Sequence, residues 1–96
     1  MSAPHATGPG DAWGRTLHGW ALNLDGSAAS GFALPRLEIE QGAAGWVCRC
    51  RFADGTSREA SNHAASIALA KRAAAELGRG RLDGACGSAL EALLAS

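Results

Sequence analysis

The chain has 96 residues, with nine Lys and Arg against nine Asp and Glu, so its formal net charge is zero. This length favours one domain, because a second hydrophobic core becomes usual only beyond roughly 100–200 residues. A zero net charge disfavours indiscriminate binding to nucleic acids or membrane surfaces, which normally requires a basic surplus. No apolar run approaches the ~20 residues that cross a bilayer, and residues 1–10 lack a basic segment followed by an apolar one. We therefore expect a cytoplasmic protein without membrane contact.

The first elements are expected to be an N-terminal arm and a helix. Residues 1–10 contain two Pro and two Gly without an apolar period, which is typical of a flexible arm. The single domain is then expected over residues 11–96. A helix is predicted over residues 11–24, because four apolar residues recur there at helical spacing: Trp13, Leu17, Trp20 and Leu24.

Alternating apolar and polar residues then predict an antiparallel sheet of three strands. The first strand is expected over residues 34–41, where Leu37 and Ile39 point inward. The second is expected over residues 46–52, with four residues pointing toward the core: Trp46, Cys48, Cys50 and Phe52. The Asp-Gly pair that follows favours a hairpin turn, which brings residues 56–60 back as a short third strand.

Two helices are expected after the sheet. Ser61 or Asn62 is suited to cap an alanine-rich helix that extends to about Leu77. A glycine-rich loop over residues 78–87 follows, and Ser88 starts a capping-box pattern for a short final helix. The predicted fold class is therefore α+β, with a three-stranded antiparallel sheet and helices packed on one face, in the order α-β-β-β-α plus a short C-terminal helix.

Three cysteines give no support for a disulfide framework or a metal site. Their odd number does not suit a set of disulfides, and Cys48 and Cys50 lie on one face of a predicted strand, where free cysteine acts as a small apolar residue. A tetrahedral zinc site would need His18, His63 and Cys86 to come together from distant segments. We expect no metal and no cofactor.

The predicted α-β-β-β-α order, together with several short sequence motifs, resembles the double-stranded-RNA-binding domain. The resemblance covers about residues 12–77 and is carried by Pro35 before the first strand, WVCRCRFADG at 46–55, and REAS at 58–61 leading to AKRAAAEL at 70–77. It implies an α-β-β-β-α scaffold and RNA contacts from the first helix, the first strand loop and a lysine cluster on the last helix. Here the loop is only residues 42–45, and the cluster is reduced to Lys71 at best. We therefore predict weak or absent binding to double-stranded RNA.

The favoured hypothesis is a small non-enzymatic interaction protein on this scaffold. No trio of nucleophile, base and orienting group is apparent, and no phosphate-binding loop follows a strand. A small neutral domain of bacterial or phage origin suits an adaptor or inhibitor that binds a protein or ribonucleoprotein partner. Anti-defence proteins encoded by phages or mobile elements, such as anti-CRISPR proteins, are of this type. Arginine is enriched at interfaces, so the expected partner-binding residues are those on the strands: Arg36, Arg49, Arg51 and Arg58.

Two alternatives remain open from the sequence. Structured RNA or another nucleic acid would be bound by the cations at the end of the long helix: Lys71, Arg72, Arg79 and Arg81. A homodimer could form by pairing of edge strands. The strand arginines also have a purely structural explanation, because acidic residues interleave with them and would pair with them across the strands on a solvated face: Glu38, Glu40 and Glu59.

Overall fold

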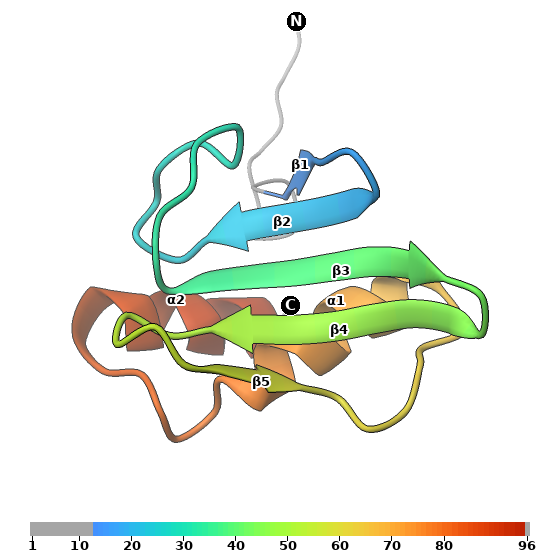
Figure 1. Cartoon of the computed structure of the whole chain (residues 1–96). Helices are drawn as coiled ribbons and strands as arrows, with labels where there is room; N and C mark the ends of the chain where they lie inside the picture. The colour runs from blue at the N-terminus through green and yellow to red at the C-terminus, as the bar shows by residue number, and fades with distance from the viewer. Residues whose placement is uncertain (1–12, 96) are drawn as a thin grey trace, which may run out of the picture.

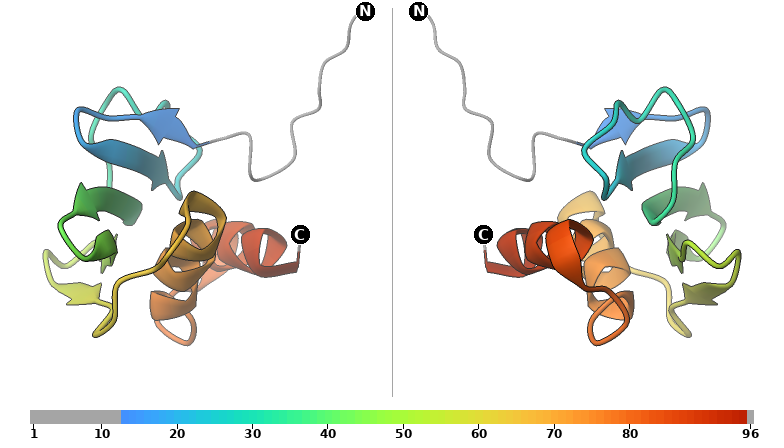
Figure 2. Two further views of the ribbon diagram at one scale, coloured as in Figure 1. Left: turned by 90° about the vertical axis from the view of Figure 1, so that its right-hand side faces the viewer. Right: turned by 90° about the vertical axis from the view of Figure 1, so that its left-hand side faces the viewer.

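The computed structural model describes residues 13–95, which form a five-stranded antiparallel sheet followed by two helices (Figure 1). The strands are β1 (Gly14–Arg15), β2 (Gly19–Asn23), β3 (Arg36–Gly42), β4 (Gly45–Arg51) and β5 (Ser57–Glu59). They lie side by side in chain order, so each strand pairs with its neighbours in sequence. The helices are α1 (Ile67–Leu77), on one face of the sheet, and α2 (Gly84–Ala95), which packs beside α1 (Figure 2). The α+β class is confirmed.

The predicted first helix is wrong, because this segment forms strands β1 and β2 with a turn over residues 16–18 instead. Trp20 and Leu22 pair with Ile39 and Leu37 of β3, so their side chains lie on the helix side of the sheet. Glycine is unfavourable inside a helix by about 1 kcal/mol relative to alanine. In the sheet, position 19 requires a glycine, because β3 approaches it closely. A Cβ on Gly19 would lie 1.9 Å from the carbonyl oxygen of Ile39. The sheet therefore has five strands rather than three, and both helices are C-terminal.

The central hairpin was predicted correctly. Leu37 pairs with Cys50 and Ile39 with Cys48, and all four side chains are fully buried against α1. Phe52, after the end of β4, is also buried, whereas Trp46 at its beginning is only half-buried. The strand over residues 56–60 is present as the shorter β5.

Both helices have different starting points from those predicted. Helix α1 begins at Ile67 rather than near residue 61, and Ser66 is its N-cap, with a side chain that accepts a hydrogen bond from the backbone N–H of Leu69. The chain cannot turn into a helix earlier, because Ala64 still forms an antiparallel bridge with Trp46 of β4. Helix α2 begins at Gly84, four residues before the predicted capping box at residue 88.

Two further predictions concern the N-terminal arm and membrane contact. The arm predicted over residues 1–10 lies outside the described residues. Within residues 13–95, neither helix has the length and apolar character that a membrane crossing requires.

Candidate functional site

The four strand arginines do not form one surface. Directly paired residues point to the same side of a sheet, so Arg36, Arg49 and Arg51 lie on the face opposite the helices, here called the outer face. Arg58 pairs with Cys50 and lies on the other face, where its guanidinium donates to the carbonyl oxygen of Leu77 at 3.4 Å, at the end of α1. The structure therefore brings three of the four predicted partner-binding residues together.

The outer-face arginines converge on one carboxylate, that of Glu38. Arg36, Arg49 and Arg51 each form an ion pair with it, at 3.0, 3.1 and 2.8 Å. Burial opposes ionisation of this carboxyl group, but hydrogen bonds from the three guanidinium groups outweigh it and hold the pKa of Glu38 below its ordinary value. Arg49 also lies 2.9 Å from Glu59. The positive charge of this face is therefore neutralised within the protein.

Arg36 is buried, with only 7% of its surface exposed, although it was predicted to contact a partner. The loop between β2 and β3 covers it. Its guanidinium donates to the side-chain oxygen of Asn23 at 2.7 Å and to the carbonyl oxygen of Gly31 at 2.9 Å, and the Phe32 ring lies 5.0 Å away. Arg36 therefore holds a loop onto the sheet.

The four cations of the nucleic-acid alternative do not form one surface either. Lys71 faces the sheet, with its ammonium 4.4 Å from the centre of the Trp20 ring. Arg72 and Arg79 meet at Glu76, at 3.7 and 3.1 Å. Arg81 lies on a loop and stacks on the buried Phe52 ring, 4.1 Å from its centre.

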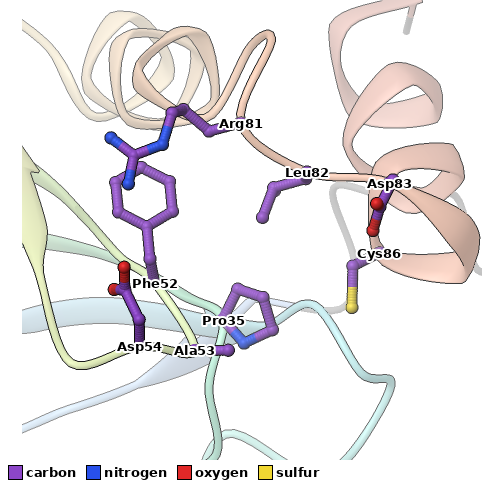
Figure 3. Close-up of a pocket in the computed structure, with 8 residues that line it drawn as sticks. All are labelled: Pro35, Phe52, Ala53, Asp54, Arg81, Leu82, Asp83 and Cys86. Carbon is purple, nitrogen blue, oxygen red and sulfur yellow. The ribbon is translucent and has the colours of Figure 1, made fainter.

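The hollow beside Arg81 has a volume of about 320 Å³ and lies where β3 begins and β4 ends (Figure 3). It contains charges of both signs, because Asp54 and Asp83 also line it. The carboxylate of Asp54 already accepts hydrogen bonds from the hydroxyl and the backbone N–H of Thr56, and these lower its pKa. Two charged side chains of this hollow, Arg81 and Asp54, thus already have partners within the protein.

A second hollow of about 330 Å³ lies at the opposite end of the sheet, where β3 ends and α1 begins. This end of the sheet is on the right in Figure 1, and it faces the viewer in the left-hand view of Figure 2. We call it the tryptophan cleft, and it is lined by Arg15, Leu17, His18, Gly19, Trp20, Gln41, Trp46 and Ile67.

Close backbone approaches build this cleft. The turn between β1 and β2 is closed by the N–H of Thr16, which donates to the carbonyl oxygen of Gly19 at 2.9 Å. The carbonyl oxygen of His18 accepts from the N–H of Gln41 at 2.9 Å, which fixes the turn against the end of β3. Because α1 begins at Ile67, that side chain lies in the first turn of the helix, on the remaining side of the cleft.

The cleft exposes apolar side chains that a folded monomer normally covers. Leu17 is 89% exposed and Ile67 is 38% exposed, and two further lining residues, Trp20 and Trp46, are only half-buried. Single exposed apolar residues are ordinary, but a group around one hollow is typical of binding surfaces. The lining contains one arginine, Arg15, and no Asp or Glu. In the described part of the chain, the lining of the cleft therefore combines apolar side chains with an arginine and no carboxylate.

Sequence reasoning missed this cleft, because a helix over residues 11–24 would have buried Leu17 and Trp20 on one face. A signal was available: Trp20, Leu22 and Leu24 also alternate, as strand residues do. With residues 19–23 assigned to a strand, Leu17 falls in a turn and becomes exposed.

The cysteines and histidines do not gather into a site in the described part of the chain. Burial raises the pKa of Cys48, and it raises the pKa of Cys50 to about 11. Cys86 is a free, half-buried thiol in the hollow of Figure 3. Residues 13–95 contain no group of three His, Cys, Asp or Glu side chains placed to hold a metal ion.

Comparison with known proteins gives no relative from which a role could be transferred: no family model, no curated protein and no solved structure matches this chain.

Proposed function

We propose that this protein is a non-catalytic interaction module, an adaptor or inhibitor, that binds a protein or ribonucleoprotein partner through the tryptophan cleft. The observation that carries the proposal is the exposure of Leu17 and Ile67 beside two half-buried tryptophans. Apolar surface held in water contributes nothing to folding, whereas burying it in a complex gains roughly 25 cal/mol per Å². Tryptophan is also among the residues that contribute most strongly to protein interfaces.

The cleft is a better candidate than the arginine surface predicted from the sequence. On the outer face, Glu38, Glu40 and Glu59 neutralise the arginines, and a partner would have to displace these ion pairs. Among residues 13–95, no acidic side chain lines the cleft beside Arg15. The favourable contacts of the cleft are therefore left for a partner to make.

The test is capture of partners by the immobilised protein from a lysate of the organism that encodes it, with and without nuclease. We expect the same protein to be retained after nuclease treatment, and to be lost with Leu17→Ser. Leu69→Ser is the matched control, because Leu69 is 59% exposed on α1 but does not line the cleft. Loss of the partner with nuclease would instead indicate structured RNA.

Undiminished capture by Leu17→Ser would place the interface elsewhere. The outer face would then be tested by Arg49→Glu and Arg51→Glu, because reversed charges at an interface repel the partner. Loss of the partner with these two variants alone would contradict the proposal and restore the arginine surface as the binding site.

A further inference from the structure

The charge around the tryptophan cleft differs from that around the outer-face arginines, which are paired with glutamates. Arg15 forms no ion pair with any residue from 13 to 95, and its guanidinium lies 5.1 Å from the centre of the Trp20 ring. Arg81, which also stacks on an aromatic ring, shares its hollow with Asp54 and Asp83. Arg15 is therefore a stacked cation in a hollow without a carboxylate, and a ligand can supply the missing anion.

The ammonium of Lys71 lies beside the same ring, 4.4 Å from its centre. Glu40 borders the other side of the β1–β2 turn, but it lies on the outer face, 3.8 Å from Arg49. Of the residues from 13 to 95, those that line the cleft include Arg15 and no Asp or Glu.

The rest of the lining suits a bulky apolar side chain. Leu17 and Ile67 are aliphatic, and the half-buried Trp46 lies between the end of β3 and the start of α1. A volume of about 330 Å³ is at the small end of the roughly 300–1,000 Å³ typical of ligand pockets, which is enough for a short segment rather than an extended surface. His18 and Gln41 can hydrogen-bond to the polar backbone of such a segment.

These features favour a peptide over a nucleic acid. Base binding relies on open aromatic faces, whereas Trp20 already has two cations near its ring and two of the other lining residues are aliphatic. The formal net charge of zero also gives no sequence-independent attraction for a phosphate backbone.

We propose that the tryptophan cleft binds a short acidic peptide segment of a protein partner, with a carboxylate on Arg15 and one bulky apolar side chain between Trp46 and Ile67. This inference rests on the proposed function and adds the chemistry of the partner.

The experiment selects binders of the full chain from a display library of short random peptides and measures one selected peptide by the change in tryptophan fluorescence. We expect enrichment of sequences with Asp or Glu close to Leu, Ile, Phe or Trp. Arg15→Gln should weaken binding about tenfold or more, the effect of losing one well-placed ion pair of about 1.4 kcal/mol. Arg79→Gln is the matched control, because its partner Glu76 is on α1, away from the cleft, and binding should change less than about twofold.

The possible failures separate the two proposals. Peptides without acidic residues whose binding is lost with Leu17→Ser would overturn the acidic chemistry and leave the cleft as the binding site. Peptides that bind Leu17→Ser as well as the wild type would overturn both. If no peptide is selected, the inference of a short acidic segment is overturned, and the proposed function is then decided by the capture experiment with Leu17→Ser.

Discussion

Replacing Glu38 by glutamine tests whether its carboxylate organises the outer face. The side chains of Arg36 and Glu38 are only 8% and 13% exposed, so this pair is close to the buried limit. Removing one partner of a buried pair costs about 3–5 kcal/mol, whereas an exposed pair contributes about 0–1 kcal/mol. Arg36 keeps two neutral acceptors, on Asn23 and Gly31, and these reduce the loss. We therefore expect Glu38→Gln to lower the free energy of unfolding by about 2–3 kcal/mol.

The assay is urea denaturation of wild type, Glu38→Gln and the control Glu40→Gln. Glu40 is 44% exposed and lies 3.8 Å from Arg49, so its replacement should cost less than about 1 kcal/mol. The pKa of Glu38 is lowered in the folded protein from an ordinary value of 4.5. Its contribution is therefore present above that pH and is lost as the pH falls through the lower folded-state pKa. Equal losses for the two variants, or a difference between wild type and Glu38→Gln that does not shrink below pH 4.5, would refute this account.

Two further predictions concern the core and a close backbone approach. Thiol reagents should modify Cys86 quickly in the native protein but Cys48 and Cys50 only slowly, because burial covers both of these sulfurs and raises their pKa values. In urea all three cysteines should react at similar rates. Fast reaction of all three thiols in the native protein would contradict the strand register. Gly19→Ala should lower the melting temperature, with a loss of about 1–3 kcal/mol or more, because its Cβ would lie 1.9 Å from a carbonyl oxygen. Gly31→Ala, whose Cβ would have only an ordinary contact at 3.6 Å, is the control, and equal melting temperatures for the two variants would show that the approach is looser than described.

The central hairpin could be predicted from sequence because only one face of its strands is packed against a helix. Leu37 and Ile39 alternate with charged residues, and that period of two has no helical equivalent. Residues 13–24 could not be assigned in the same way, because Trp20 and Leu24 satisfy a helical and a strand period equally. What decides between them is the contact of Gly19 with β3, which is a tertiary feature.

The outer face and the tryptophan cleft also differ in how far they can be predicted from the sequence. The arginines and glutamates of the outer face alternate along adjacent strands, so their cross-strand ion pairs could be anticipated from spacing. The cleft joins residues from a turn, four strands and the first turn of a helix. Its composition depends on where α1 begins, and Ile67 becomes a lining residue only because the bridge between Ala64 and Trp46 delays that start.

The shortness of β1 has a consequence for the dynamics of the cleft. This strand has two residues, Gly14 and Arg15, and it pairs only with β2 at the edge of the sheet. Hydrogen bonds at such an edge open with a small fraction of the free energy needed for global unfolding, so their amides exchange with solvent early. The guanidinium that we assign to ligand binding is therefore carried by one of the least protected strands. Its position can adjust to an incoming segment while the tryptophan of β2 stays fixed, and a bound partner should slow hydrogen exchange most in residues 14–19.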